Sequence, residues 1–261
     1  MDAKGGEGMT RACNVVDGDE CRPPTPDAAV LDGGLTKYPG GKNGAGVWQR
    51  LISLMPPHRV YVEPFLGSGA ILRRKRSAAV NFGIDVDRQV IDAHFWSPNR
   101  THGCIDLFCG DALEWLQQRA DWRGDELVYC DPPYLGSARG DERPRYRHEM
   151  LSEDRHREFL RLATSLPAMV MISGYPSALY DEALKGWRRI EYTAQTRGGP
   201  KREVVWMNYP EPTELHDYRF LGADYHDRCR LKRKISRWAT RLQSLPALER
   251  AAILAALKGE V

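Results

Sequence analysis

Short apolar segments alternate with amphipathic segments through most of this chain, and this alternation constrains the fold more than any other feature. Strands are expected at residues 59–63, 79–85, 104–109, 126–130, 168–173, 187–193 and 203–208. Helices are expected at residues 70–77, 88–95, 112–119, 152–165 and 177–184. The alternation predicts an α/β domain built on a doubly wound, largely parallel sheet. Ligands of such sheets bind beyond the carboxyl ends of the strands, so a site is expected in the segments that follow them.

The N-terminal end differs from this alternating domain, which is expected to span residues 35–215. Residues 1–34 are rich in Gly, Asp, Pro and Thr, contain seven acidic and three basic residues, and are expected to form a disordered tail. The remaining chain holds 35 basic and 28 acidic residues, a net charge of +7. A basic folded part suits a nucleic-acid partner without proving one.

Residues 225–261 are expected to form a basic helical appendage. Five apolar residues at spacings of 4, 3, 4 and 3 mark one helix face: Leu231, Ile235, Trp238, Leu242 and Leu245. Pro246 ends this helix, and a second is expected at 247–257. Seven cations and no acid lie at positions 228–241. The sequence leaves open whether the first helix packs on the domain with its cations in solvent, or whether the cations contact phosphates.

Composition excludes several classes of protein. No apolar stretch approaches the roughly 18–20 residues of a membrane-spanning helix, and the first residues lack the apolar centre of a secretion signal. The six cysteines form no CxxC pair, so neither a zinc ribbon nor a redox motif is indicated. Cys104, Cys109 and Cys130 lie in apolar stretches and are expected to be reduced core residues of a cytoplasmic protein.

The strongest motif is Asp131-Pro132-Pro133-Tyr134, directly after the strand expected at 126–130. A rigid turn that only closes the strand would also explain the two prolines. The set suits an exocyclic amine, because Asp131 and the Pro132 carbonyl can each accept a hydrogen bond and the proline rings fix that carbonyl. Tyr134 offers a ring on which a nucleobase can stack. The two acceptors would direct the nitrogen lone pair towards an electrophile.

Two glycine-containing segments precede this motif. Residues 63–69 (EPFLGSG) follow the first expected strand, where glycines let a ligand approach the backbone before a helix N-terminus. Residues 37–42 (KYPGGK) lie near the start of the domain. Taken singly, the first also fits an ordinary glycine turn and the second a surface turn.

In this chain order, the three segments resemble those of the D12-class, or Dam-like, adenine-specific DNA methyltransferases of the alpha group. The resemblance covers roughly residues 35–210 and includes residues 202–208 (REVVWMN), which are similar to the closing strand of the family. Residues 146–149 (YRHE) resemble the phage- and prophage-borne branch. The resemblance implies a Rossmann-like methyltransferase fold, with a seven-stranded, mostly parallel sheet whose last strand is antiparallel.

The resemblance also implies S-adenosylmethionine as methyl donor, S-adenosylhomocysteine as product, and no metal. The residues that it assigns to the donor are Tyr38 and Lys42 at the methionine end, Glu63, Phe65, Gly67 and Gly69 around the methionine and ribose, Asp85 at the ribose hydroxyls, Asp111 near the adenine, and Asp131. Asp87 rivals Asp85 for the ribose, and the pattern does not decide between them. The catalytic motif that it implies is Asp131, Pro132, Pro133 and Tyr134.

The sequence departs from the Dam-like family in one respect. Those enzymes carry a target-recognition domain before the catalytic motif, but only about twenty residues separate Asp111 from Asp131 here. Contacts to DNA are therefore expected from the basic segment 135–150, the basic C-terminal helix and the segment 196–202. Residues 135–150 otherwise fit a solvated charged loop, and residues 196–202 a basic hairpin turn. The candidate nucleic-acid-binding residues are Arg139, Arg143, Arg145, Arg147, Arg197 and Lys201. Without that domain, we expect a very short or relaxed target sequence.

The implied reaction is methylation of the N6 amino group of adenine in double-stranded DNA. The target base must leave the helix, because its amino group is buried in base pairing. The residues leave cytosine N4 and RNA open as alternative substrates. A glutamine methylase is disfavoured because it more often has Asn in place of Asp131, and the intact motifs disfavour a catalytically silent DNA-binding module. A monomer is expected, and roles in restriction-modification, phage DNA protection or nuclease partnership stay open.

Overall fold

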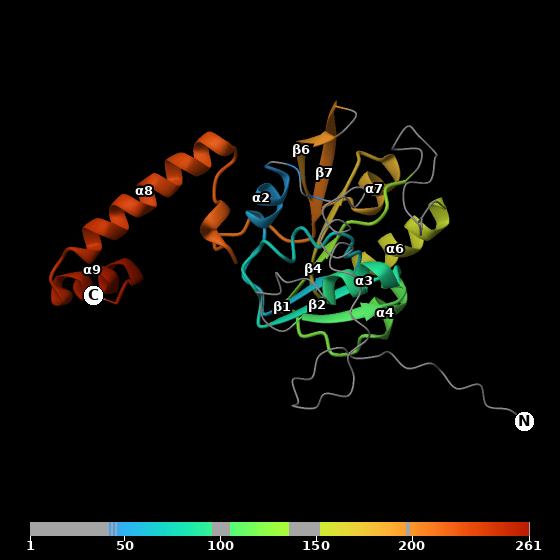
Figure 1. Ribbon diagram of the computed structural model, residues 1–261, viewed down its shortest axis with the longest axis horizontal. Coiled ribbons are helices and arrows are strands. Elements are labelled where there is room, and N and C mark those ends of the chain that lie inside the picture. Colours follow the sequence, from blue (N-terminus) through green and yellow to red (C-terminus); the bar gives the residue numbers. More distant parts are fainter. Residues whose placement is uncertain are drawn as a thin grey trace, which may run out of the picture.

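The centre of the molecule is a single mixed sheet. The computed structural model describes residues 42, 44, 46–95, 105–135, 152–196 and 199–260. The strands are β1 (Val60–Glu63), β2 (Val80–Asp85), β3 (Ile105–Cys109), β4 (Glu126–Cys130), β5 (Met169–Gly174), β6 (Arg188–Thr196) and β7 (Gly199–Met207). They lie in the order β3-β2-β1-β4-β5-β7-β6 (Figure 1). The first five are parallel, and β7 is antiparallel to β5 and β6. The predicted Rossmann-like methyltransferase fold, with its antiparallel last strand, is confirmed.

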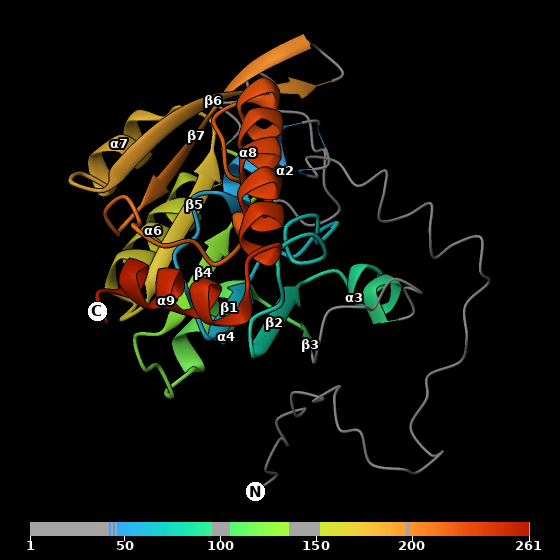
Figure 2. The same cartoon turned by 90° about the vertical axis from the view of Figure 1, so that its left-hand side faces the viewer.

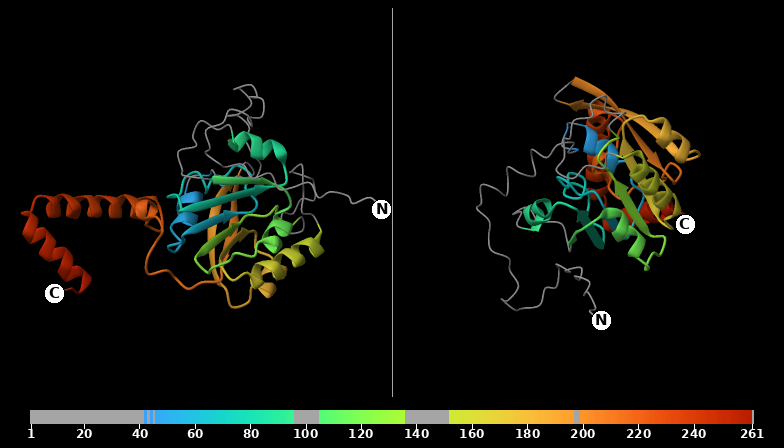
Figure 3. Two further views of the ribbon diagram at one scale, coloured as in Figure 1. Left: turned by 90° about the horizontal axis from the view of Figure 1, so that it is seen from below. Right: turned by 90° about the vertical axis from the view of Figure 1, so that its right-hand side faces the viewer.

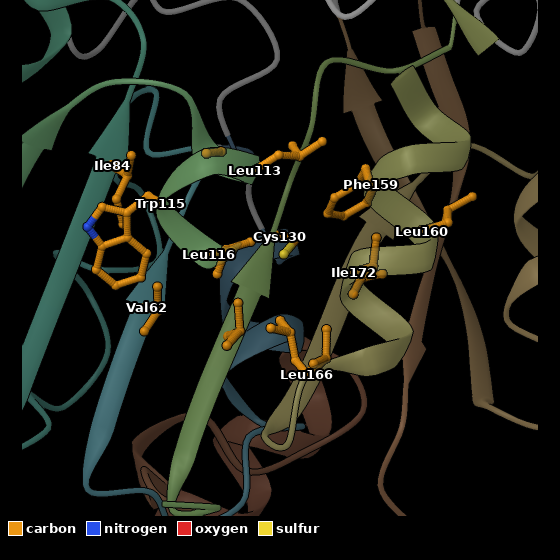
Figure 4. Close-up of a cluster of buried hydrophobic side chains, with 14 of the residues drawn as sticks. Val62, Ile84, Leu113, Trp115, Leu116, Cys130, Phe159, Leu160, Leu166 and Ile172 are labelled. Atoms are coloured by element: carbon orange, nitrogen blue, oxygen red, sulfur yellow. The ribbon is translucent and has the colours of Figure 1, made fainter. Parts of the chain in front are cut away.

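Helices cover both faces of this sheet (Figures 1 and 2). The helices of the domain are α2 (Val47–Ile52), α3 (Arg88–Phe95), α4 (Ala112–Gln118), α6 (Glu153–Ser165), α7 (Ala178–Ala183) and the 3₁₀ turn η1 (Tyr218–Phe220). Helices α4, α6 and α7 contribute to one apolar cluster, part of which Figure 4 shows, and α2 and α3 contribute to the other. Both faces of a parallel sheet are normally covered in this way.

The central strand β4 shows how the sequence serves both clusters. Its five residues are all buried. Successive side chains of a strand point to opposite faces, and accordingly Val128 and Cys130 join the cluster under α4, α6 and α7, whereas Leu127 and Tyr129 join the other. An unbroken apolar run is therefore what this position in the sheet requires. It ends at Asp131, where the chain leaves the core.

The helix expected at residues 70–77 is wrong: the segment forms a series of turns. In a helix, the Leu72 amide would donate to the Ser68 carbonyl, but it donates instead to Oε2 of Glu63 at 3.1 Å. The Arg74 amide bonds the Ile71 carbonyl in a 3₁₀-like manner, next to the α-like bond from Lys75 to Ile71. A buried carboxylate thus replaces part of the helical hydrogen-bond pattern.

The structure also bears on two other expectations. Residues 196–202 were expected to form either a DNA-contact loop or a basic hairpin turn, and β6 and β7 form a hairpin whose pairing runs from Arg188 with Met207 to Thr196 with Gly199. Cys130 is buried as expected, but Cys109 is exposed because it lies at the last position of an edge strand. Cys104 lies outside the described residues.

The C-terminal helices α8 (Tyr225–Gln243) and α9 (Ala247–Lys258) lead away from the sheet (Figure 1 and the left view of Figure 3). Neither helix has a buried residue, so the apolar stripe of α8 is not packed on the domain. The segment before α8 is anchored by an edge-on contact of Phe220 with Trp48, with 4.8 Å between ring centroids. In the part of the chain that the structure describes, none of the helices has the length and hydropathy needed to span a membrane.

Candidate active site

Four polar side chains converge where the apolar strands end. Glu63 is the last residue of β1, Asp131 follows β4, and Ser173 is near the end of β5. Because β7 runs antiparallel to β5, Val204 lies opposite Gly174, and Glu203 therefore also lies at this edge. The topology brings residues from distant parts of the sequence to the position where doubly wound folds bind ligands.

Lys42 joins this edge and lies between two carboxylates. Its Nζ is 2.8 Å from Oδ1 of Asp131 and 3.6 Å from Oε2 of Glu203. The side chains of Lys42, Asp131 and Glu203 are only 6%, 17% and 7% exposed. Buried charges are retained only when they are paired, so these three groups depend on one another. Lys42, which the resemblance assigns to the methionine end of the donor, thus lies directly beside Asp131.

The carboxylate of Asp131 is held through one oxygen. Lys42 Nζ and Ser173 Oγ both donate to Oδ1, each at 2.8 Å. Ser173 in turn accepts from the Tyr129 hydroxyl at 2.9 Å. Among the described residues, none donates to Oδ2 of Asp131. That oxygen is therefore left to accept a hydrogen bond from a ligand.

Opposing effects set the pKa of Asp131. Burial raises the pKa above its ordinary value, and the charge and hydrogen bond of Lys42 lower it. The Glu203 carboxylate acts in the same direction as burial. Lys42 therefore favours the ionised form of Asp131, which is the form that can accept from an amine.

Tyr134 is fixed at both its hydroxyl and its ring. The hydroxyl accepts a short hydrogen bond from Lys42 and donates to Oε2 of Glu203 at 3.3 Å. The same Glu203 oxygen accepts from the Tyr192 hydroxyl at 2.8 Å. The ring of Tyr134 meets that of Tyr175 edge-on, with 4.6 Å between centroids. Pro132 is buried, and Pro133 is half-buried beside it. The motif is a rigid part of the site.

The glycine turn after β1 is held from two directions. Gly67 and Gly69 have φ angles of 46° and 57°, in the left-handed region that favours glycine. The Gly67 amide donates to Oδ2 of Asp85 at 2.8 Å. The Gly67 carbonyl accepts from Nε2 of His94 at 2.9 Å. A Cβ atom at position 69 would overlap the His94 imidazole.

His94, on α3, thus supports the turn as a neutral donor. Burial lowers the pKa of His94 to about 4, so the ring is uncharged at neutral pH. Since Nε2 contacts a carbonyl oxygen, Nε2 carries the proton of the neutral ring. The sequence did not single out His94, because its spacing to the glycines is set by the packing of α3 on the sheet.

Glu63 is buried at the base of the turn. Its Oε2 accepts from the Tyr61 hydroxyl at 2.9 Å and from the Leu72 amide at 3.1 Å. Burial nevertheless raises the pKa of Glu63 to about 8. The carboxyl group is therefore mostly protonated at neutral pH, and a cation placed beside it would favour release of that proton.

The acids expected to contact the donor all have structural partners as well. Asp85 ends β2 and, besides Gly67, accepts from the Asp87 amide at 2.9 Å. Its rival Asp87 accepts from the Gln89 amide at 2.9 Å near the start of α3. Asp111 caps α4 and pairs with Arg155 at 2.5 Å.

The remaining predicted residues fall in three places. Phe65 packs edge-on against Phe159, with 5.5 Å between centroids. Lys201 is exposed on β7, although its pairing partner Ala194 is buried. Tyr38, Arg139, Arg143, Arg145, Arg147 and Arg197 lie outside the described residues.

Sequence analysis missed Glu203, Ser173, Tyr192 and His94. Glu203 is the acid that opens the otherwise apolar run EVVWM, and Ser173 is the hydroxyl near the end of MVMISG. A polar residue at the end of a buried strand is a usable signal in a doubly wound fold. Tyr192 and His94 carry no comparable signal.

Comparison with solved structures finds similar chains. A candidate RNA methyltransferase from Pyrococcus horikoshii shares 14% identity at a TM-score of 0.43, over 69% of this chain and 97% of its own. Magnesium protoporphyrin IX methyltransferase from Synechocystis PCC 6803, with bound SAM, shares 15% sequence identity at a TM-score of 0.40. The match covers 62% of this chain and 75% of that protein. TrmK from M. capricolum, in complex with S-adenosylhomocysteine, shares 9% sequence identity at a TM-score of 0.39. The match covers 81% of this chain and 93% of TrmK. No protein-family model and no curated protein matches the sequence. At these identities and scores, the similarities assign no activity to this chain.

Proposed function

We propose that this chain is an S-adenosylmethionine-dependent methyltransferase that modifies the N6 amino group of adenine in DNA. The observation that carries the proposal is that the two carboxylate oxygens of Asp131 differ in their hydrogen bonds. Oδ1 is tied to Lys42 and Ser173, while no described residue donates to Oδ2, directly before Pro132, Pro133 and Tyr134. This arrangement suits an amine that must be oriented and needs no prior deprotonation.

The donor site fits the proposed cofactor. Gly67 presents no Cβ atom at the turn after β1, and a Cβ at Gly110, after β3, would meet no atom within 4 Å. Asp85 presents a carboxylate at the end of β2, and the next residue, Val86, is an exposed apolar side chain at the same edge. Backbone approach, a carboxylate for ribose hydroxyls and an apolar surface match the chemistry of an adenosyl group. S-adenosylmethionine, when bound, supplies an electrophilic methyl group.

The residues of the chain act on the nucleobase in three ways. Oδ2 of Asp131 and the Pro132 carbonyl accept from the amino group and orient its lone pair. Tyr134 supports the base through its ring, whose position Lys42 and Tyr175 fix. The charge of Lys42 opposes the effect of burial and favours the ionised form of Asp131, in which Oδ2 can also take the proton that the amine loses. Most of the rate enhancement would then come from positioning and from fixed acceptors.

The test is transfer of labelled methyl from S-adenosylmethionine to unmethylated duplex DNA, followed by nucleoside mass spectrometry. N6-methyladenine is expected with the intact protein. Asp131→Ala is expected to lower turnover by about 10²–10⁴-fold and to leave donor binding largely intact. Asp92→Ala is the matched control, because Asp92 is a partly exposed surface residue. Near-normal turnover of Asp131→Ala would contradict the role of Asp131, and N4-methylcytosine or labelled RNA would assign another substrate.

We also propose a very short or relaxed target sequence. Only α4 and β4 lie between Asp111 and Asp131, so this interval has no room for a recognition domain. Mapping of methylated positions on DNA of random sequence would test this. Strict modification at one site of about six or more base pairs would contradict it, because each specified pair needs its own contacts.

A further inference from the structure

We propose that one face of α8 binds the phosphate backbone of duplex nucleic acid, apart from the catalytic edge of the sheet. This inference rests on the proposed function, in which a nucleic acid is the substrate. It adds the surface of the protein that binds that nucleic acid. The cations of this face recur at spacings of three or four residues, which places them on one side of a helix. They are Arg230, Arg233, Lys234, Arg237 and Arg241, and the name cationic face refers to these five residues.

The cationic face is exposed and largely unpaired. All five side chains are exposed. Arg230 pairs with Asp227 at 2.6 Å, but the other four cations make no ion pair with any described residue. From Arg228 to Leu248 the chain contains seven cations and no acid. In the catalytic domain, by contrast, cations such as Arg119, Arg155 and Arg189 have carboxylate partners.

The residue types favour phosphate over other anions. Four of the five cations are arginines, whose planar guanidinium groups bind phosphate oxygens in a bidentate manner. Neighbouring cations three or four residues apart are about 5–6 Å apart at their Cβ atoms, and long side chains can span from there to successive phosphates. Such contacts read no sequence, which is consistent with a relaxed target.

The apolar residues of α9 disfavour an anionic membrane as the partner of that helix. A helix that lies on a membrane presents one apolar face to it. On α9, however, Leu248 and Leu257 are 86% and 76% exposed and nine residues apart. Nine residues are about two and a half helical turns, so the two leucines lie on opposite faces. Helix α9 therefore offers a membrane no single apolar plane, whereas α8 has an apolar stripe, and the vesicle arm of the experiment below tests a membrane as the partner of α8.

The experiment measures binding of the full-length protein to a fluorescent duplex of about 25 base pairs, a length that exceeds the reach of α8, at several salt concentrations. The variant Arg233→Gln/Lys234→Gln/Arg237→Gln/Arg241→Gln is expected to bind at least about tenfold more weakly. Its slope of log affinity against log salt should fall by about 3–4, since each phosphate contact contributes about 0.9. Circular dichroism and donor binding should match the unchanged protein.

Two lysines give a matched control within α8. Lys234 lies on the cationic face, whereas Lys232 is two residues from both Arg230 and Lys234 and so points to the other side. Lys234→Glu should weaken duplex binding several-fold more than Lys232→Glu. Equal effects of the two substitutions would overturn the proposal, because they would indicate a general influence of net charge.

The two proposals fail in different ways. Failure of the proposed function would appear as absence of methyl transfer, whether or not the duplex binds through α8. Failure of the present inference would appear as unchanged duplex affinity and salt slope in the fourfold variant, with methyl transfer intact. Vesicles of equal parts phosphatidylserine and phosphatidylcholine are the second probe. Binding to these vesicles that needs the four cations, without such binding to the duplex, would also overturn it.

Discussion

The edge of the sheet around Asp131 and the C-terminal appendage place similar side chains in opposite surroundings. Lys42 is buried between Asp131 and Glu203, whereas Arg237 on α8 is exposed and has no described carboxylate partner. The same contrast holds for apolar groups, since the side chain of Ile172 in β5 is fully buried but that of Ile235 in α8 is 51% exposed. Lys42 and Ile172 thus have their partners inside the domain, whereas Arg237 and Ile235 face solvent. Substitutions that remove equivalent groups from the two regions test this contrast.

The largest effect is expected from Lys42→Met. Removing one partner of a buried ion pair costs about 3–5 kcal/mol, because the remaining charge is left unpaired. Here two carboxylates lose their common cation. The free energy of unfolding, measured with urea, should fall by that amount, while Lys232→Met on α8 should change it by less than about 0.5 kcal/mol. A small effect of Lys42→Met would show that the pair does not stabilise the fold.

The same variant has a second expected result in the pH dependence of methyl transfer. Asp131 must be ionised to accept from an amine, so activity is lost as the pH falls through its pKa. Because Lys42 lowers this pKa, the acid limb of the profile should move to higher pH in any active Lys42→Met enzyme. An unmoved limb would show that another group controls it.

The next effect concerns two isoleucines. Ile172→Ala should lower the free energy of unfolding by about 2–5 kcal/mol, since it leaves a cavity in the core. Ile235→Ala should change it by no more than about 0.5 kcal/mol, because that side chain is half exposed. Thermal and urea unfolding of the two variants would compare the regions directly. A loss at Ile235 as large as that at Ile172 would mean that a partner, such as a second copy, already covers α8.

A smaller effect is expected from Gly69→Ala. The added methyl group would overlap the His94 ring, and the left-handed backbone disfavours alanine. The cost should be about 1–3 kcal/mol, seen as weaker donor binding in calorimetry and a lower melting temperature. Gly259→Ala is the control, because Gly259 is also left-handed but its Cβ would meet no neighbouring atom within 4 Å. Equal donor affinity in the two variants would show that the turn at Gly69 does not contribute to donor binding.

The smallest effect is a pH dependence of donor binding. The pKa of Glu63 is raised to about 8, and a cationic donor beside it would favour the ionised form. Donor affinity should therefore rise by about tenfold from pH 7 to pH 9, as expected for one proton released per donor bound. Glu63→Gln should abolish this rise. A rise that persists in Glu63→Gln would assign the released proton to another group.

Much of the fold could be predicted from the sequence, because the strands and helices carry their own patterns. The limits of α3 and β4 coincide with residues 88–95 and 126–130, and Ser152 caps α6 as expected. The segment after Glu63 could not be predicted in this way. Its helical pattern is overridden by a carboxylate from β1, and that contact exists only in the folded protein.

The candidate site was predictable in part. The motif at Asp131 could be found because its four residues are adjacent in the sequence. Glu203 could not be assigned, since its position beside Asp131 depends on the insertion of β7 between β5 and β6, and the position of Ser173 depends on the pairing of β5 with β4. The apolar stripe of α8 shows another limit, because amphipathic spacing predicts a helix without specifying what covers it.

The length of α8 has a consequence for how the protein would move on its substrate. Nineteen residues make a helix of about 28 Å, which equals roughly eight base-pair steps. A helix of that length that contacts only phosphates lets a protein slide along the duplex without dissociating. An enzyme with this device would modify several adenines on one long molecule before dissociating. Shortening α8 would then make methylation distributive, even where each single transfer is unchanged.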